Sequence, residues 1–340
     1  MPEPALEAAD VSMHFPVHGK DAGRLGQRRY VHAVDGASLA IYPGQVTALV
    51  GESGSGKSTL ARVLAGLYRR TSGEIRLHGI PVEARRGKAL RRHVGEVQLI
   101  LQDPYGSFNP MLRVATHLRR AVHIHEPQLK GDDLEVRLRE LLERVHLRPA
   151  SQFLVKYPHE LSGGQLQRVS IARALAARPS VILADEPVSN LDVSIRLGVL
   201  NLLADLTAGT DKQGTGKQGT GLLYVTHDVA SARYFAAETA VMYAGQLIES
   251  GSSETVTSEP AHPYTRLLIS SAPDPARVPG SDRVKDMGQP PSLISPPTGC
   301  RFHPRCPFAM PRCQTQQPPR SELGDGHWTR CWLFAEGTPT

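Results

Sequence analysis

The residues with the clearest chemistry form a glycine-rich loop, Gly51-Glu-Ser-Gly-Ser-Gly-Lys57-Ser58. The loop fits the pattern G-x-x-x-x-G-K-[ST], in which glycines let consecutive backbone N–H groups turn inward around phosphate oxygens. The lysine of this pattern reaches the outer phosphates of a nucleotide, and the following hydroxyl binds Mg²⁺. The residues that we expect to contact a nucleoside triphosphate are Gly51, Ser53, Gly54, Gly56, Lys57, Ser58 and Thr59.

Two adjacent carboxylates end an apolar run farther along the chain, in Val181-Ile-Leu-Ala-Asp185-Glu186. The carboxyl ends of buried parallel strands are where open α/β sheets place their ligand crevice. At such a strand end, Asp185 suits the Mg²⁺ shell and Glu186 is placed to polarise an attacking water. In isolation the pair is compatible with two solvated acids. Together with the glycine loop it indicates nucleotide hydrolysis.

The segments around these residues alternate between strand and helix patterns. The apolar run 46–50 predicts a buried parallel strand ahead of the loop, and Leu60, Val63 and Leu64 recur at helical spacing after it. Further buried strands are expected at 180–184 and 222–226, while 112–156 carries helical periodicity. We therefore expect an α/β fold with a mostly parallel sheet, an antiparallel β N-terminal part and a helical insert at about 106–169.

Composition narrows the class of protein. The 340 residues, 40% hydrophobic and 21% charged, fit one large globular domain with a smaller part. No apolar run approaches the roughly 20 residues of a membrane span, and the acidic N-terminus lacks the pattern of a secretory signal. Without such a span, we expect no direct membrane insertion. The net charge of +6 is spread over separated arginine pairs, so we also expect no direct nucleic-acid binding.

Two segments have the composition of loops. The tandem five-residue repeat at 212–221 is too rich in glycine and threonine to bury a core. Prolines become frequent from about residue 272, which is typical of a linker. We expect a surface loop at the first segment and a linker to a C-terminal extension at the second.

The segment Leu161-Ser-Gly-Gly-Gln165 lies between the glycine loop and the acidic strand end, and it resembles the signature sequence of ABC transporter ATPases. Gln102, Asp192 and His227 stand in the order of that family's other motifs, so the resemblance covers residues from about 30 to 250. It implies an ABC ATPase fold that binds ATP and Mg²⁺ and couples ATP hydrolysis to transport.

The resemblance also implies a role for individual residues. Gln102 would join Ser58 and Asp185 around Mg²⁺, sense the lytic water and face a membrane partner. His227 would contact the γ-phosphate, and Asp192 would belong to the D-loop. Tyr30 is the candidate for the aromatic that stacks on adenine. The residues that would bind the γ-phosphate of ATP held by an opposite subunit are Ser162, Gly163, Gly164 and Gln165. A second ATPase subunit, identical or paralogous, is therefore expected.

All four cysteines lie near the C-terminus, with the spacing C-x5-C-x6-C-x17-C: Cys300, Cys306, Cys313 and Cys331. The paired short spacings of zinc ribbons do not occur here, and disulfides are not expected in a reducing cytoplasm. Four thiolates can hold an iron–sulfur cluster. We rank a cluster first, zinc second and free thiols third.

The tail resembles the C-terminal region of the peptide/nickel class of ABC import ATPases, through Glu259-Pro-Ala-His-Pro-Tyr264 and Gly299-Cys-Arg-Phe-His-Pro-Arg-Cys306. Some members of that class carry a [4Fe–4S] centre in this tail. The resemblance implies a nucleotide-binding domain at 1–255 and an extension at 256–340. It also implies two permease subunits, an extracytoplasmic solute-binding protein, and a peripheral position on the cytoplasmic side of the cell membrane.

The function predicted from these features is the ATPase subunit of an importer of di- or oligopeptides. Oligosaccharide or nickel import stays open, because the ATPase does not touch the solute. A soluble ABC ATPase acting on nucleic acid usually carries two cassettes or long inserts, and neither occurs in this sequence. An iron–sulfur regulatory protein would not need this set of nucleotide motifs.

Overall fold

The computed structural model describes residues 3–18, 28–83, 87–208, 219–271 and 288–335. The chain divides into two compact units. The first, here called the helical unit, comprises Met1–Leu6, Ile41–Val46 and Leu77–Leu223. The second, here called the loop unit because it contains the glycine loop, comprises Glu7–Ala40, Thr47–Arg76 and Tyr224–Thr340.

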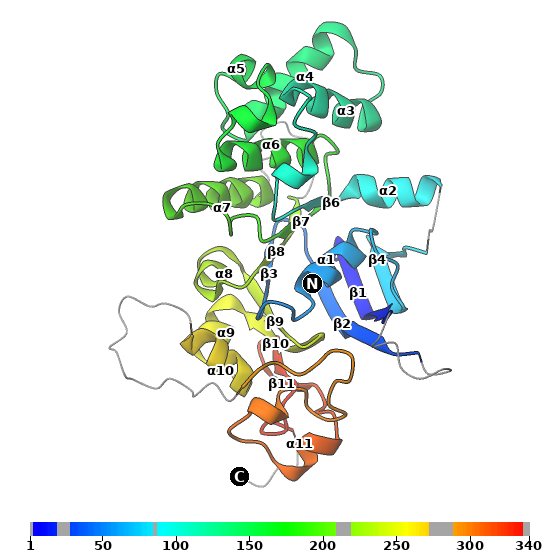
Figure 1. Ribbon diagram of the computed structural model, residues 1–340, viewed down its shortest axis with the longest axis vertical. Coiled ribbons are helices and arrows are strands. Elements are labelled where there is room, and N and C mark those ends of the chain that lie inside the picture. Colours follow the sequence, from blue (N-terminus) through cyan, green and yellow to red (C-terminus); the bar gives the residue numbers. More distant parts are fainter. Residues whose placement is uncertain (1–2, 19–27, 84–86, 209–218, 272–287, 336–340) are drawn as a thin grey trace. The chain divides into compact units, whose positions relative to one another are not determined.

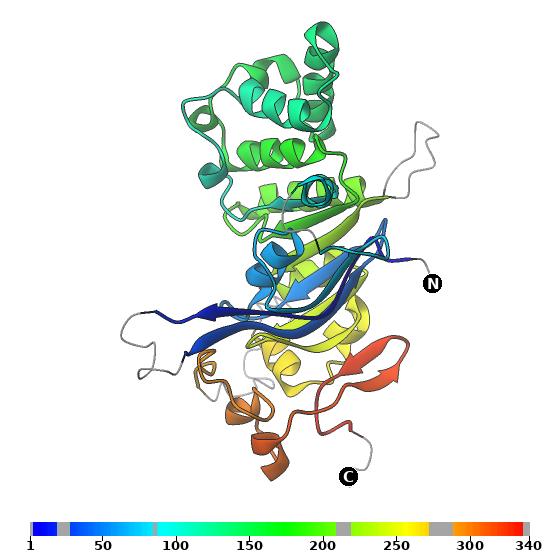
Figure 2. The ribbon, with the colours of Figure 1, turned by 90° about the vertical axis from the view of Figure 1, so that its right-hand side faces the viewer.

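The N-terminal strands form a four-stranded sheet in the order β2-β1-β4-β5. Its members are β1 (Leu6–Pro16), β2 (Tyr30–Ile41), β4 (Ser72–Leu77) and β5 (Ile80–Pro81). Figure 2 shows β1 and β2 as two long strands side by side. Backbone hydrogen bonds join Ala5 to Ile41 and Val17 to Arg29, so the two strands run antiparallel, as predicted.

The second sheet has eight strands, in the order β11-β12-β10-β9-β3-β8-β7-β6. They are β3 (Val46–Val50), β6 (Val97–Ile100), β7 (Val181–Asp185), β8 (Gly221–Thr226), β9 (Glu238–Tyr243), β10 (Gln246–Ser252), β11 (Ser321–Gly324) and β12 (His327–Thr329). In the helical unit β6 and β7 are parallel, with Val97 opposite Val181. In the loop unit β3 and β9 are parallel, while β10 pairs antiparallel with β9 and β12. Strands β3, β7 and β8 are buried along their whole length, as expected for apolar parallel strands.

Among the described residues, six helices belong to the helical unit: α2 (Lys88–Glu96), α3 (Val114–His125), α4 (Gly131–Arg144), α5 (Ala150–Leu154), α6 (Gly163–Leu175) and α7 (Val193–Ala208). Figure 1 shows α3 to α6 gathered into one group. Leu118, Val122, Leu138 and Leu141 are fully buried in it. The periodic spacing of Leu138, Leu141 and the other apolar residues of 134–145 was the signal for the helical insert, which the structure confirms.

The described part of the loop unit contains five helices: α1 (Lys57–Leu64), α8 (Val229–Phe235), α9 (Ser253–Ser258), α10 (Pro263–Ser270) and α11 (Pro311–Thr315). Short 3-10 turns occur at Tyr105–Ser107, Pro158–Glu160 and His303–Arg305. The last of these turns lies between the first two cysteines of the tail.

The predicted fold class is confirmed, including the buried strands at 46–50, 180–184 and 222–226, which the structure bounds to within one residue. Most of the five-residue repeat and the start of the proline-rich segment lie outside the described residues. None of the helices in the described part of the chain has both the length and the apolar character needed to cross a bilayer. The boundary at 255/256 stays a prediction.

Candidate nucleotide site

The glycine loop connects the end of β3 to the start of α1 in the loop unit. Gly51 and Gly56 have φ angles of 156° and 107°, a region that residues with a side chain rarely adopt. A Cβ on Gly51 would lie 2.2 Å from the Met242 carbonyl oxygen, and one on Gly56 would lie 2.1 Å from that of Ala33. The loop therefore requires glycine at both positions for two reasons, its backbone angles and its close packing.

Lys57 is the first residue of α1 and is only 4% exposed. Its ammonium donates to the carbonyl oxygens of Gly51 and Glu52, at 2.7 and 2.8 Å. The charge of Lys57 is thus held over the loop by the loop's own backbone, next to the N-terminus of a helix. Both features favour an anion. Ser58 and Thr59 follow in the first turn of α1 and are half-buried, while Ser53 and Gly54 are exposed.

The two acids at the end of β7 lie in the helical unit. Asp185 is 2% exposed, and Glu186 has a left-handed backbone with φ of 47°. Such backbone is uncommon outside glycine and concentrates at functional sites. It turns the chain sharply at the point where the apolar strand stops.

Gln102 lies two residues after the end of β6, the strand that pairs with β7. Its Nε2 donates to Glu186 Oε2 at 3.1 Å and to Ser189 Oγ at 3.3 Å. Ser189 in turn donates from Oγ to the Glu186 carbonyl at 3.1 Å. The structure thus brings together two of the three predicted catalytic residues, Gln102 and Glu186, and adds Ser189, which the sequence analysis did not assign.

The signature residues form the N-terminus of α6. Ser162 is the N-cap: its Oγ accepts from the Gln165 N–H at 3.3 Å, and Gln165 Oε1 accepts from the Ser162 N–H at 3.1 Å. This reciprocal capping box fixes the first turn of the helix. A Cβ on Gly164 would lie 2.4 Å from Ile195 Cγ2 on α7, so a larger residue would separate the two helices. Ser162 is exposed, and Gly163 and Gln165 are half-buried.

Asp192 and His227 lie at the starts of two further helices. The Asp192 carbonyl accepts from the N–H groups of Ile195 and Arg196 at the beginning of α7, and the residue is exposed. His227 follows β8 in the loop unit and is exposed. The next residue, Asp228, caps α8 by accepting from the Ala230 N–H at 3.0 Å.

Tyr30, the predicted adenine-stacking residue, is the first residue of β2 and is 37% exposed. A second aromatic in the loop unit was missed. Phe15 near the end of β1 is half-buried and packs edge-to-face on Tyr68, with ring centroids 5.5 Å apart. Tyr68 lies shortly after the end of α1, so Phe15 packs against the segment that follows this helix. The signal in the sequence was a lone aromatic at a strand end.

The four cysteines lie in the tail of the loop unit, with Cys313 and Cys331 buried and the other two half-buried. The Cys300 N–H donates to the Cys313 carbonyl at 2.8 Å. Burial raises the pKa of Cys300 to about 11 and that of Cys331 to about 12, and the other three cysteines each contribute to the shift at Cys331. The four thiols are therefore neighbours, and their donor set fits a group that binds four thiolates.

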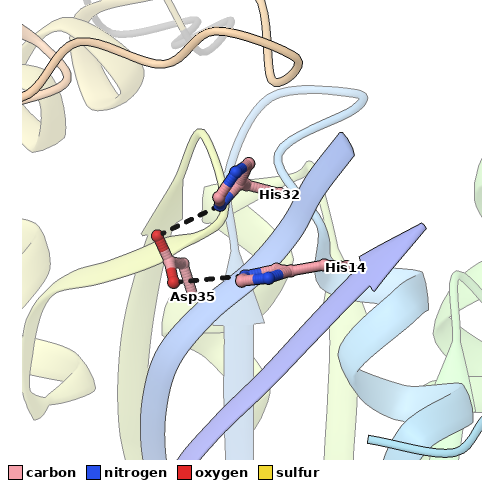
Figure 3. Close-up of side chains that lie close together, drawn as sticks. All are labelled: His14, His32 and Asp35. Atoms are coloured by element: carbon pink, nitrogen blue, oxygen red, sulfur yellow. Dashed lines mark hydrogen bonds and ion pairs between the residues drawn. The ribbon is translucent and has the colours of Figure 1, made fainter. Parts of the chain in front are cut away.

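A separate cluster in the loop unit combines two imidazoles and a carboxylate (Figure 3). His14 Nε2 lies 3.3 Å from Asp35 Oδ1, and His32 Nδ1 lies 3.8 Å from Asp35 Oδ2. Their ligand atoms lie within 4.8 Å of one another, as a metal site requires. However, Arg301 from the tail also donates to Asp35 Oδ2. Its charge already neutralises the only carboxylate, so we interpret the cluster as an anchor for Arg301.

Comparison with known proteins agrees with this geometry. A family model described as "ABC transporter" matches residues 34–189, and one described as "Oligopeptide/dipeptide transporter, C-terminal region" matches residues 248–313. Among solved structures, the chain resembles a dimeric ATP-binding cassette bound to ADP and Pi, with a TM-score of 0.61 and 26% identity. That match covers 73% of this chain and 98% of the other. The fold and motifs thus define an ABC transporter ATPase.

Curated relatives define the subclass. A putative oligopeptide transport ATP-binding protein of Bacillus subtilis is 40% identical over 97% of this chain and 96% of its own length. A dipeptide transport ATP-binding protein of Haemophilus influenzae is 38% identical, with the same shares covered. An oligopeptide transport ATP-binding protein of Salmonella typhimurium is 37% identical over 92% of this chain and 91% of its own length. The chain belongs to the oligopeptide/dipeptide transport family of ABC ATP-binding proteins.

Proposed function

We propose that this chain is the ATP-hydrolysing subunit of an importer that takes up di- or oligopeptides. The observation that carries the proposal is the joint presence, in one chain, of the Gln102–Glu186 pair and a tail that matches the oligopeptide/dipeptide transporter model. The curated relatives with peptide transport in their names match along almost the whole chain. Nickel and oligosaccharide import are the alternatives within the class.

In this proposal each motif acts on MgATP. The glycine loop binds the phosphates through its N–H groups and Lys57, and Ser58 and Asp185 bind Mg²⁺. Glu186 polarises the attacking water, with Gln102 holding its carboxylate in place. His227 contacts the γ-phosphate. Phosphoryl transfer depends mainly on such positioning and charge neutralisation.

The signature residues serve a second ATPase subunit. The capped N-terminus of α6 presents an exposed serine and the positive end of a helix, which suit a phosphate. We propose that Ser162 to Gln165 bind the γ-phosphate of ATP in the other subunit, with Asp192 beside them. Two permease subunits and an extracytoplasmic binding protein complete the transporter, and the chain lies on the cytoplasmic side of the membrane.

Exposed apolar side chains after Gln102 support a permease partner. Tyr105 is 50% exposed, Met111 79% and Leu112 39%, and exposed apolar groups that cluster in one segment are typical of interaction surfaces. A cleft of about 120 Å³ opens beside them, lined by Gln102, Tyr105 and Gly163 among others. The apolar segment and the cleft together give a partner helix both a contact surface and a path to Gln102.

The test is purification of the tagged full-length chain from membranes in mild detergent. We expect two permease subunits to accompany the tagged chain. Met111→Asp should lose these subunits, whereas Val136→Asp, a change at a 51% exposed apolar position on α4, should keep them. Recovery of nucleic acid in place of permeases would contradict the proposal. Growth of the deletion strain on single peptides or single oligosaccharides then identifies the solute class.

We further propose that the four cysteines hold a [4Fe–4S] cluster, with zinc as the second choice. Among the described residues, no three of these sulfurs lie within 4.8 Å of one another. A closed tetrahedral zinc site, with bonds of about 2.3 Å, holds its sulfurs about 3.8 Å apart. A cluster that binds all four thiolates would cross-link the tail.

A further inference from the structure

The glycine loop contains an acidic residue. Glu52 is the second residue of the loop, directly beside Gly51, and its side chain is 29% exposed. A triphosphate carries several negative charges, so a carboxylate at this place opposes the attraction that Lys57 and the helix N-terminus supply. This opposition is removed when a cation pairs with the Glu52 carboxylate.

The compensating charge comes from the tail. Arg305 NH1 donates to Glu52 Oε2 and Arg305 NH2 to Glu52 Oε1, both at 3.0 Å. The guanidinium is 4% exposed and also donates to the Tyr243 hydroxyl at 3.3 Å. Two parallel, charge-assisted bonds of this kind fix both the charge and the orientation of a carboxylate. Screening by water is weak because the arginine is buried.

The surroundings of the pair are built from the same two tail segments that identify the family. Tyr264 accepts a hydrogen bond from the Glu52 N–H at 2.8 Å, and it is fully buried. His262 Nδ1 accepts from the Tyr264 N–H at 3.0 Å and caps α10. The His-Pro-Tyr segment therefore places a hydroxyl on the backbone of Glu52, and the segment between the first two cysteines places a guanidinium on its side chain.

A second arginine anchors this segment. Arg301, also 4% exposed, donates to Asp35 on β2 and to the Ala244 carbonyl. The rings of Tyr243, Tyr264 and Phe302 pack together with centroids 4.4 to 5.5 Å apart. Arg305 is thus held by contacts on several sides and is preorganised to meet Glu52.

We propose that Arg305 is a positioning residue of the nucleotide site, which cancels the charge of Glu52 so that the glycine loop keeps its affinity for polyphosphates. The inference rests on the proposed binding of ATP by this loop. Through Arg305, the cysteine-bearing tail contributes directly to the ATP site.

The test measures the Kd of MgATP, MgADP and AMP for the full-length chain by titration calorimetry at low salt. Arg305→Met leaves the charge of Glu52 uncompensated. We therefore expect the Kd of ATP to rise about tenfold, the Kd of ADP to rise less and the Kd of AMP to stay unchanged. Glu52→Gln in the same chain removes the carboxylate and is expected to restore the Kd to within about threefold. Glu52→Gln alone is expected to bind ATP at least as tightly as the parent chain.

Arg320→Ala is the matched control. Arg320 is another tail arginine, paired with Glu322 at 2.6 Å but exposed, and its loss should leave every Kd unchanged. A purely structural role for Arg305 would lower thermal stability and affect all three nucleotides alike, and this result would overturn the inference. So would a double variant that binds ATP as weakly as Arg305→Met.

Two further outcomes are informative. If the parent chain binds no ATP, the proposed role of the loop is itself wrong. If Arg305→Met does not fold by circular dichroism, the single Glu52→Gln variant decides: ATP binding weaker than that of the parent contradicts charge compensation, and equal or tighter binding supports it.

Discussion

Gln102 donates from its side-chain amide to the Glu186 carboxylate at 3.1 Å, although 84 positions separate the two residues. They meet because β6 and β7 are parallel neighbours and each residue follows the end of its strand. The left-handed backbone of Glu186 turns its side chain away from the strand direction. If the loop that carries Gln102 moves, its amide therefore moves the Glu186 carboxylate, which is the group proposed to polarise the water.

We predict that Glu186→Gln abolishes most ATP hydrolysis and preserves ATP binding. The amide keeps the shape and still meets Gln102, but it cannot take a proton from water. General-base catalysis contributes roughly 100- to 10,000-fold, so the rate of phosphate release from the assembled transporter should fall by about that factor. Kd for MgATP measured on the purified chain should stay within about threefold.

The control for Glu186→Gln is Asp205→Asn, which removes an exposed carboxylate from α7 in the same unit and should leave turnover unchanged. With ATP, the Glu186→Gln chain should also pair with its partner ATPase on a sizing column. A chain that stays monomeric with the partner ATPase and ATP would contradict the shared site.

Gln102→Ala tests the other side of this pair. Loss of a hydrogen bond to a charged group costs about 1.5–3 kcal/mol when the charge depends on it, so we expect turnover to fall about tenfold or more. Gln98→Ala on β6, which removes an amide that donates to the Val94 carbonyl, is the matched control. An unchanged rate for Gln102→Ala would show that Glu186 is held by other contacts.

The sequence was sufficient for most of the fold because the strongest patterns were periodic. The continuous apolar run 46–50 indicated a buried strand, and the spacing of the leucines within 112–156 indicated amphipathic helices. Both were confirmed. Likewise, a motif such as Ser162 to Gln165 carries its own local geometry, since the serine and glutamine cap each other. Short-range interactions of this kind can be predicted from the sequence.

Long-range polar partners were not predictable in the same way. Arg305 and Glu52 are 253 positions apart, and no periodicity connects them. One signal was available: an acid inside a loop that binds anions calls for a cation nearby, and two arginines stand between the first two cysteines. Choosing between Arg301 and Arg305 required the structure, which pairs the first with Asp35 and the second with Glu52.

The Ser162 position allows stability and catalysis to be separated. Ser162→Ala removes the cap and should cost about 1 kcal/mol in the free energy of unfolding, measured by urea titration. Ser162→Asp caps a helix as well as serine, so stability should be kept, but its charge would oppose the γ-phosphate of the other subunit. We expect turnover of the assembled transporter to fall about 100-fold in Ser162→Asp. A fully active Ser162→Asp transporter would exclude a phosphate at this helix terminus.

The adenine-stacking residue is testable by comparing nucleotides. Stacking of a base on an aromatic ring is worth about 1–3 kcal/mol. Tyr30→Ala should therefore weaken the binding of ATP about fivefold or more, while the affinity for inorganic tripolyphosphate stays unchanged. Tyr234→Ala, which removes a tyrosine 67% exposed on α8, is the control. If Phe15→Ala gives the selective loss and Tyr30→Ala does not, the stacking role belongs to β1 and the assignment of Tyr30 is wrong.

The metal content of the tail is settled by chemical analysis of protein purified without oxygen. A [4Fe–4S] cluster predicts about four iron and four sulfide per chain, whereas the zinc alternative predicts about one zinc and no sulfide. Cys306→Ser should lower the iron and sulfide content and also the midpoint of thermal unfolding, because it removes one ligand of the cross-link. Thr298→Ala, which removes a hydroxyl two residues before the first cysteine, is the control and should keep the metal content and the unfolding midpoint. Neither metal nor sulfide in the parent chain would leave four neutral thiols, whose raised pKa values at Cys300 and Cys331 already fit burial without a ligand.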